Sequence, residues 1–406
     1  MPAIIQYPTV VQQALDQFGD HFQNEPERRH FAEYLTGLLI ARKKNVSAIN
    51  REFAFTTDQS CLNRFVTEVD WDAESLNTDR LEWLQQDPKT RYSKSGVIAI
   101  DNVLIDHSGK HIEDVGYFWD HAESRSKIAH DYLIVNYVCN SGKQYPLEFY
   151  RFVKKEECQK KEIEFLDHNV LFRNQVDWVI ANEIPGDFTF DSWFTHKDNL
   201  NHINFHQRNY VGDLKLNRKI IFQGQEIKAE ELARTIEPDA RKLIMIGGQR
   251  QYYFTKSVKI PGVDHKVRIL ILWKKKKDTD PRKILVCNRC HWEAIRMLKV
   301  YRCRWQGTEC FHRDGKQYLG MGDCQLRNGL GQTRHMYMVF LAYSVLMSQM
   351  QQNRVCEWAR ERLTTIGQSC MAVMRETLSD TISWVVDQIE LEGLSFERIK
   401  IQLDLP

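Results

Sequence analysis

The feature that most constrains the fold is an apolar run with one acid in its middle. Residues 97–105 read VIAIDNVLI and place Asp101 between two groups of aliphatic side chains. Such a run predicts a strand buried on both faces of a sheet. A buried carboxylate costs several kcal/mol unless it is paired, protonated or bound to a metal. Two interpretations are open from this segment alone. In one, Asp101 is a functional carboxylate within a buried strand. In the other, the strand ends at Ile100 and Asp101 begins a turn.

The order of the following segments predicts an α/β fold. KIAHDYLIVNYVC and KQYPLEFYRFV, separated by NSG, have the pattern of a hairpin. A charged helical segment follows over residues 154–184. Two further strands, DFTFDSWF and NYVGDLKLN, are predicted around the segment THKDNLNHINFH. A β-β-β-α-β-α-β order is typical of a layered α/β protein with a mixed sheet and flanking helices.

Composition shifts along the 406 residues divide the chain into five predicted regions. They are a helical region (1–92), the first part of an α/β core (93–217), a β-rich insertion (218–284), the second part of the core (285–350) and C-terminal helices (351–406). In the first region, Thr57 and Asp58 predict a helix start, and the helices fit either a helix-turn-helix or a simple bundle. The insertion ends in WKKKKDTDPRK, which is either a solvated loop or a phosphate contact.

Charge and cysteine usage are those of a cytosolic globular protein. The net charge is only +2, so any nucleic-acid partner has to be sought in local basic stripes. The ten cysteines are scattered through core-like segments, which favours reduced thiols. The N-terminal residues lack a signal peptide's basic and apolar regions, and no window approaches a membrane span. We therefore expect a cytoplasmic protein without a membrane partner.

Two further acids resemble Asp101 in their setting. Asp191 follows the short strand DFTF, so it lies at a strand's carboxyl end, where α/β sheets bind ligands, or it caps the next helix. One predicted helix face carries an acid and several bases, Glu309, His312, Arg313 and Lys316, which is equally typical of a solvated, salt-bridged surface.

Taken together, these segments resemble a known family. AIDNVLID, DSWFTHK with NYVGDLKLNRK, and above all YRCRWQGTECFHRDGKQYLGMGDCQLRN are similar to the blocks of DDE insertion-sequence transposases that carry a tyrosine-arginine-glutamate-lysine signature. The resemblance covers roughly residues 95–345 and implies an RNase H-like catalytic fold with a β-rich insertion before the last acid. It implies an endonuclease for DNA transposition and recombination.

The resemblance also implies roles for individual residues. Three acids correspond to the metal ligands and catalytic residues: Asp101, Asp191 and Glu309. The residues implied to bind DNA are Tyr301, Arg304, Arg313, Lys316 and Trp193, the last by stacking on a flipped base. Three carboxylates are hard oxygen ligands, so Mg²⁺ is the implied cofactor and Mn²⁺ its substitute. Two such ions stabilise the attacking and leaving oxygens of an in-line displacement at phosphorus.

The match departs from the family at two positions. Four residues, WQGT, separate Arg304 from Glu309, where the family usually has three, and Asn102 stands where relatives often carry a second acid. We expect Gly307 to break the helix, so that Glu309 begins a new helix with Thr308 near its cap.

Two other motifs suggest different metals. Cys287-Asn288-Arg289-Cys290-His291 matches the string of c-type haem attachment, and Cys287 and Cys290 could hold zinc with Cys303, Cys310 or His312. Buried free cysteines are favoured over both. His196, His202 and His206 also suggest a metal face, but no acid stands as in HExxH, so a solvated helix is favoured.

The function predicted from sequence is therefore a DNA transposase. It would bind the terminal inverted repeats of its element, cut the ends and join them to target DNA, as a homodimer on the DNA. One alternative is an RNase H-like nuclease without strand transfer, and another is a catalytically inactive DNA-binding regulator derived from a transposase.

Overall fold

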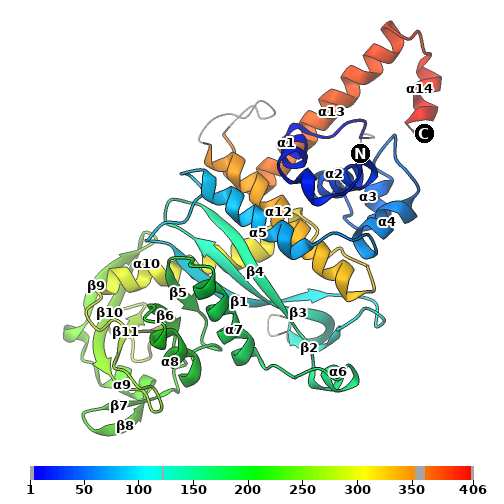
Figure 1. Cartoon of the computed structure of the whole chain (residues 1–406). Coiled ribbons are helices and arrows are strands. Elements are labelled where there is room, and N and C mark those ends of the chain that lie inside the picture. The colour runs from blue at the N-terminus through cyan, green and yellow to red at the C-terminus, as the bar shows by residue number, and fades with distance from the viewer. Residues whose placement is uncertain (1–3, 121–122, 353–361, 404–406) are drawn as a thin grey trace. The chain divides into compact units, whose positions relative to one another are not determined.

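The computed structural model describes residues 4–120, 123–352 and 362–403 (Figure 1). The chain forms two compact units. Unit 1 contains residues 1–91, 104–131 and 311–406, and unit 2 contains residues 92–103 and 132–310. The strands β1 (Val97–Asp106) and β3 (Arg125–Val138) contribute residues to both units.

Unit 2 is built on a mixed sheet. Its strand order is β3-β1-β5-β6-β12-β11-β10-β9, and β4 pairs with β3. The further strands are β4 (Gln144–Phe152), β5 (Asp187–Phe190), β6 (Tyr210–Asp213), β9 (Lys242–Ile246), β10 (Gln249–Val258), β11 (Val267–Trp273) and β12 (Lys283–Cys287). The predicted hairpin of β3 and β4 and the strand that continues β1 past Ile100 are both present. The interpretation that ended this strand at Ile100 is therefore wrong.

Three parallel strands lie at the centre of the unit 2 sheet. Val97 of β1 is the register partner of Asp187 of β5, and Phe188 of β5 is the partner of Tyr210 of β6. The next strand, β12, is antiparallel to β6. The carboxyl ends of β1, β5 and β6 consequently meet at one edge, as in α/β folds that bind ligands there.

Helices cover both faces of this sheet, as the side-chain alternation of the strands requires (Figure 1). On one face, α10 (Ala294–Trp305) packs Met297, Val300 and Cys303 onto a core that includes Ala99 of β1. On the other, Phe172 of α7 (His168–Ala181) packs edge-on against Phe190 of β5, with ring centroids 5.1 Å apart. The α/β class with a mixed sheet and flanking helices is confirmed, and the arrangement is RNase H-like.

The segment between β6 and β12 is rich in strands, as its pattern predicts. Its strands β9, β10 and β11 extend the main sheet through antiparallel pairs. The remaining elements of unit 2 are the hairpin β7 (Lys219–Phe222) and β8 (Gln225–Lys228), the helices α6 (Lys155–Lys160), α8 (Lys197–Phe205) and α9 (Ala229–Thr235), and the short turns η2 (Pro238–Ala240) and η3 (Gln306–Cys310). The charged segment expected to be one helix is two, because Asp167 caps the start of α7 with hydrogen bonds to backbone amides.

Unit 1 is largely helical. Its elements are α1 (Thr9–Phe18), η1 (Gly19–His21), α2 (Glu25–Ile40), α3 (Val46–Asn50), α4 (Gln59–Thr67), α5 (Ala73–Gln86), β2 (Gly116–Asp120), α11 (Phe311–Tyr318), α12 (Gly329–Gln351), α13 (Ile366–Glu390) and α14 (Phe396–Gln402). The predicted helix start is confirmed, since the Asp58 carboxylate accepts from Ser60 N at the start of α4. The strand β2, which pairs with β3, was not predicted.

Two bulk properties bear on the sequence predictions. The helices among the described residues include none long and apolar enough to cross a membrane. The nine cysteines in the described part of the chain are free thiols, and Cys356 lies outside it.

Candidate active site

Two of the predicted acids belong to neighbouring parallel strands of the unit 2 sheet: Asp101 lies in the middle of β1, and Asp191 directly follows the end of β5. The register pairs Ala99 of β1 with Thr189 of β5, and two residues further along each strand stand Asp101 and Asp191. Side chains two residues apart share a face, and Ala99 packs in the core under α10. Asp101 and Asp191 therefore project toward the α10 side.

Asp191 occupies a tight turn after β5. Its Oδ1 accepts a hydrogen bond from Trp193 N at 2.8 Å, and the helix that follows, α8, is instead preceded by His196. The helix-cap interpretation of Asp191 is therefore wrong. The same turn leaves the Trp193 ring 55% exposed, with Lys215 Nζ 5.4 Å from its centroid, so a flat face remains open to a partner.

Glu309 reaches the site through an irregular helix. The residues from Ala294 to Tyr318 are helical without a break, and η3 between α10 and α11 is a π-helical turn. The expected break at Gly307 is wrong. A π turn accommodates one more residue than an α turn, which accounts for the four residues between Arg304 and Glu309.

Gly307 has a packing role in this turn. A Cβ at this position would lie 2.3 Å from Val138 Cγ2 and 2.9 Å from Ala99 Cβ, so only glycine lets the helix approach the sheet this closely. Thr308 is not a cap either: it is buried and its hydroxyl donates to Arg304 O at 2.9 Å.

Arg304 joins two of the three acids. Its Nη1 lies 2.7 Å from Asp101 Oδ2, and its Nη2 lies 3.9 Å from Glu309 Oε1. The Arg304 side chain is only 15% exposed, so this pair is poorly screened by water. Arg304 thus lies against two of the predicted metal ligands, Asp101 and Glu309.

The carboxyl groups of Asp101 and Asp191 are difficult to ionise because their pKa values are raised. Burial, together with the negative charge of Asp191 and against the opposing effect of Arg304, raises the pKa of Asp101 to about 7. Burial also raises the pKa of Asp191, which the Trp193 backbone hydrogen bond and Arg304 oppose. Burial is therefore the main reason why these two carboxyl groups resist ionisation.

Sequence reasoning missed a second polar group beside the acids. Asp213 ends β6, one step beyond Gly212, whose register partner is Phe190, so it follows the same edge as Asp191. Its Oδ2 accepts from Lys283 Nζ at 2.9 Å and from the Tyr301 hydroxyl at 3.3 Å, while Lys283 Nζ also donates to that hydroxyl at 2.9 Å. The sequence signal that could have identified Asp213 is its place at the end of NYVGD, the segment that forms the strand after β5.

Tyr301 is thus fixed in the same network as Asp213 and Lys283, and Lys283 Nζ stands 4.8 Å from the Tyr301 ring centroid.

The other two residues predicted to bind DNA, Arg313 and Lys316, belong to unit 1. There, Arg313 pairs with Asp314 at 3.0 Å, and Lys316 Nζ donates to Leu104 O at 2.8 Å.

The three acids have the hard oxygen atoms that a divalent cation prefers, but one ligand atom from each does not lie within 4.8 Å of the other two. Asp101 is buried, and the negative charge of the neighbouring carboxylates adds to the effect of burial on its pKa. A bound cation would offset this charge. Asp101, Asp191 and Glu309 are the residues that could hold it, and Arg304 now provides part of the compensation.

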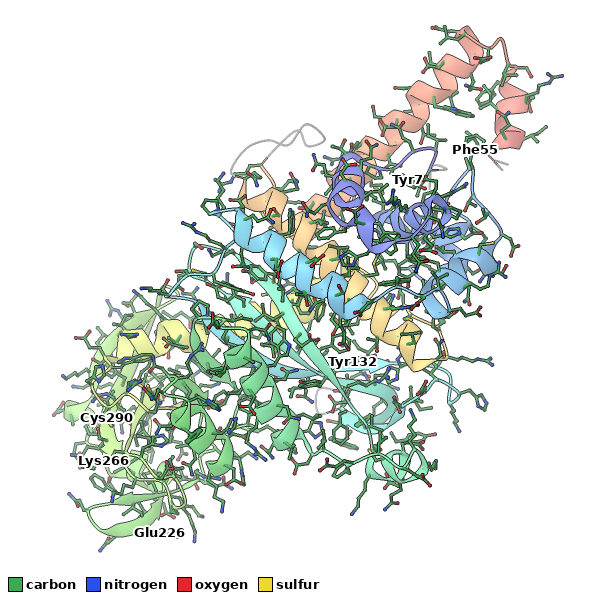
Figure 2. The ribbon with its side chains drawn as sticks, viewed as in Figure 1. Tyr7, Phe55, Tyr132, Glu226, Lys266 and Cys290 are labelled. Atoms are coloured by element: carbon green, nitrogen blue, oxygen red, sulfur yellow. The ribbon has the colours of Figure 1, made fainter. Side chains whose placement is uncertain are left out.

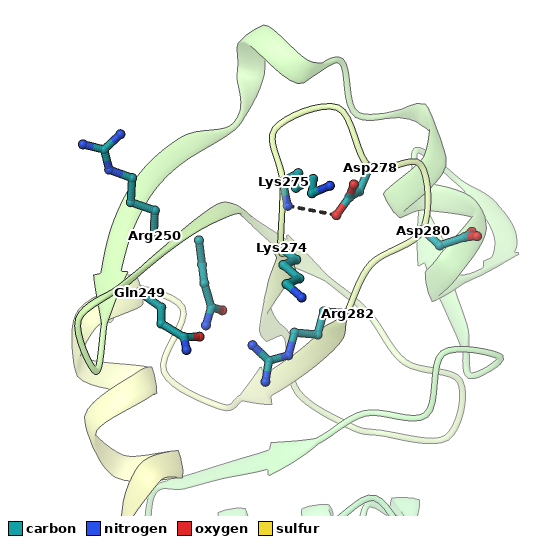
Figure 3. Close-up of a pocket in the computed structure, with 8 residues that line it drawn as sticks. Gln249, Arg250, Lys274, Lys275, Asp278, Asp280 and Arg282 are labelled. Atoms are coloured by element: carbon teal, nitrogen blue, oxygen red, sulfur yellow. Dashed lines mark hydrogen bonds between the residues drawn. The ribbon is translucent and has the colours of Figure 1, made fainter.

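A hollow in the insertion gathers basic side chains. It has a volume of about 750 Å³ and is lined by Gln249, Arg250, Gln251, Lys274, Lys275, Asp278, Asp280 and Arg282. Figure 3 shows Arg250 pointing away from the other side chains and the Asp278 carboxylate bonded to the Lys275 backbone amide, at 2.9 Å. Asp280 pairs with Arg234, which leaves Lys274 and Arg282 directed into the hollow.

The cysteine motif makes local contacts of another kind. Cys290 Sγ donates to Lys266 O at 3.6 Å, and Figure 2 labels these two residues close together, with Lys266 in the insertion and Cys290 just after β12. Burial raises the pKa of Cys287 to about 12, which disfavours the thiolate that zinc binds. In the part of the chain that the structure describes, no ligand atom of a third His, Cys, Asp or Glu groups with those of Cys287 and Cys290.

Comparison with known families gives two matches. The model of the DDE superfamily endonucleases matches residues 17–236, more than half of the 406 residues. The model of the transposase DDE domain matches residues 169–345, which include Asp191 and Glu309. No curated protein matches the chain.

Proposed function

Because the chain belongs to the DDE superfamily of endonucleases, whose members cleave nucleic acid, we propose that it is a DNA transposase. In this proposal it binds the terminal inverted repeats of its element, cleaves both ends and joins the 3′ ends to target DNA. The observation that carries the proposal is the placement of Asp101 and Asp191 at matching positions of the adjacent parallel strands β1 and β5, with Arg304 joining Asp101 to Glu309.

The three acids are proposed to hold divalent cations, Mg²⁺ or in its place Mn²⁺. Two bound ions would stabilise charge on the attacking and leaving oxygens at phosphorus. The protein positions the ligands: the sheet register sets Asp101 beside Asp191, the Trp193 amide orients the Asp191 carboxylate, and the π turn presents Glu309. Since a buried, pre-oriented site reorganises little, its charges act strongly on the reacting phosphate.

Basic and aromatic residues are proposed to hold the DNA. Arg304 offers a forked donor to a phosphate once a cation replaces it at Asp101, and Tyr301 offers a hydroxyl held in place by Lys283. The exposed Trp193 ring is proposed to stack on a displaced base, which any base can do. Arg313 and Lys316 are proposed to contact phosphates.

The hollow of the insertion extends the proposed DNA surface. Lys274 and Arg282 lie in it away from the acids that line it, which favours phosphate contact over the solvated-loop alternative. Residues 1–92 are proposed to recognise the element's ends. A fragment that begins near Ser93 should then lose its preference for terminal repeats over random DNA, and undiminished preference would contradict this assignment.

A joining assay separates the proposal from its closest alternative. Purified protein is incubated with Mg²⁺, a labelled duplex carrying a terminal repeat and a supercoiled target plasmid. A transposase yields labelled plasmid, in which two ends are joined by a pair of protomers. A nuclease yields only cut duplex, and a DNA-binding regulator yields a shifted but uncut duplex.

A further inference from the structure

The histidines of α8 meet an acid that the sequence pattern did not reveal. His202 and His206 are four residues apart, so their rings stand one turn above another on a single helix face, with centroids 4.8 Å apart. Asp177 lies 25 residues before His202, on α7. The sequence interpretation of a merely solvated helix looked for the acid on the same helix and therefore missed it.

The polar atoms of all three side chains converge around Asp177 Oδ1. His202 Nε2 lies 2.7 Å and His206 Nε2 lies 3.0 Å from the same oxygen, Asp177 Oδ1. One ligand atom from each residue lies within 4.8 Å of the other two. Ligands of a tetrahedral zinc ion, each about 2.0–2.1 Å from the metal, are separated by roughly 3.3 Å. Small side-chain movements would therefore let an ion replace the present contacts.

Buried polar contacts hold the two helices in register. The Asn199 side chain, fully buried in α8, accepts from Arg173 Nη1 at 3.0 Å and donates to Asn169 Oδ1 at 2.8 Å, and both partners belong to α7. At the end of α8, Asn204 Oδ1 accepts from Asn288 at 3.1 Å. The backbone positions of the three candidate ligands are thus set independently of any ion, which lowers the cost of binding one.

The chemistry of the ligands selects the ion. Two imidazoles and one carboxylate suit zinc and other borderline transition metals, whereas Mg²⁺ requires oxygen ligands. The side chains are partly exposed, 24% for each histidine and 50% for Asp177, so an ion can enter from solvent. Three protein ligands leave a fourth position for water.

We propose that Asp177, His202 and His206 form a zinc site that clips α8 to α7. The site is distinct in its ligands from the three acids proposed for catalysis and does not depend on them. Because the ion would bind the folded state, zinc should stabilise the protein against unfolding.

The experiment is a calorimetric titration of the full-length protein with Zn²⁺ at neutral pH, in excess Mg²⁺ so that the three acids are occupied. We expect one equivalent of zinc to bind the wild type and to raise its melting temperature. His202→Ala and Asp177→Asn should each weaken zinc binding at least about tenfold and abolish the rise. His196→Ala is the matched control, since His196 is outside the cluster and faces Asp198. It should behave as the wild type.

Two results would overturn the proposal. One is the absence of zinc binding to the wild type. The other is unchanged zinc affinity in both His202→Ala and Asp177→Asn, with loss of binding in Cys287→Ser pointing to the cysteine motif instead. Asp177→Asn preserves side-chain size, so it remains informative if His202→Ala fails to fold. Both readouts are independent of DNA cleavage.

Discussion

Arg304 Nη1 lies 2.7 Å from Asp101 Oδ2, and the same guanidinium approaches Glu309 Oε1 at 3.9 Å. A divalent cation bound at Asp101 would compete with Arg304 for the charge of this carboxylate. We infer that Arg304 orders the acids before the cation binds and then becomes available to a phosphate. The arginine therefore links assembly of the site to arrival of the substrate.

Arg304→Ala should reduce DNA cleavage at least about tenfold, equivalent to roughly 1.4 kcal/mol of lost transition-state stabilisation. Arg304→Lys should recover only part of the rate, because lysine keeps the charge but lacks the forked geometry. Single-turnover cleavage measures both. Arg302→Ala, at an exposed position of the same helix, is the control. Equal rates for the Arg302 and Arg304 variants would remove Arg304 from the site.

Gly307→Ala should destabilise the protein by about 1–3 kcal/mol, the usual cost of overpacking a core. The added Cβ would overlap Val138 and Ala99 and push η3 with Glu309 from the sheet, so cleavage should also fall. Gly322→Ala is the comparison, because a Cβ there meets no atom within 4 Å. Urea unfolding of both variants measures the difference. If Gly307→Ala were as stable as Gly322→Ala, close packing would not be the reason for this glycine.

Lys316→Ala tests whether this lysine contacts DNA. Its amine now donates to Leu104 O, a contact whose loss at an exposed residue should change stability by no more than ~0–1 kcal/mol. We expect a folded variant that cleaves or joins DNA at least about tenfold more slowly. Gln317→Ala, at the next exposed position of α11, should cleave normally. Near wild-type rates for Lys316→Ala at saturating Mg²⁺ would refute the phosphate contact.

His335 should make the protein less stable in mild acid. Its Nδ1 accepts from the Tyr34 hydroxyl at 2.7 Å and its Nε2 donates to Gly320 O at 2.8 Å, so the neutral ring is fully bonded. Burial lowers the pKa of His335 from 6.5 to about 4. Since the unfolded chain takes up the proton first, stability is complete above pH 6.5 and falls as the pH drops toward 4.

When the pH is lowered from 7 to 5, the titration of His335 should lower the free energy of unfolding by about 2 kcal/mol. His335→Gln lacks the titrating group, so its loss of stability over the same interval should be smaller by that amount. Denaturant unfolding at the two pH values measures both proteins. Identical pH dependence in the two would show that His335 does not titrate as its burial requires.

The sequence patterns predicted the strands better than the connections between them. An apolar run around Asp101 and the short strand before Asp191 are local features, and both strands formed as expected. The π turn at Gln306–Cys310 was not predictable from local propensity, because its cause is the approach of Gly307 to the sheet. Long-range packing of this kind leaves no signal in a short window of sequence.

The same limit applies to the site. The partners of Tyr301 come from two strands far away in sequence, and the acid beside His202 comes from another helix. Residue types at family positions predicted which side chains to examine. The contacts between these side chains, such as that of Arg304 with Asp101, depend on the sheet register and on where α10 packs against the sheet.

The most direct test of the proposed active site compares two acids at opposite ends of one strand. Asp191 follows the carboxyl end of β5, whereas Asp187 begins β5 and faces Arg296 at 3.8 Å. Asp191→Asn and Asp187→Asn remove the same charge from the same strand, and Asp101→Asn and Glu309→Gln complete the set.

The measurement is Mg²⁺-dependent cleavage of a duplex that carries a terminal repeat, alongside DNA binding by each variant. We expect no cleavage above background by the Asp101, Asp191 and Glu309 variants in Mg²⁺ or Mn²⁺, with DNA binding retained and with Asp187→Asn still active. Cleavage by any of the three variants at a rate close to that of Asp187→Asn would contradict it.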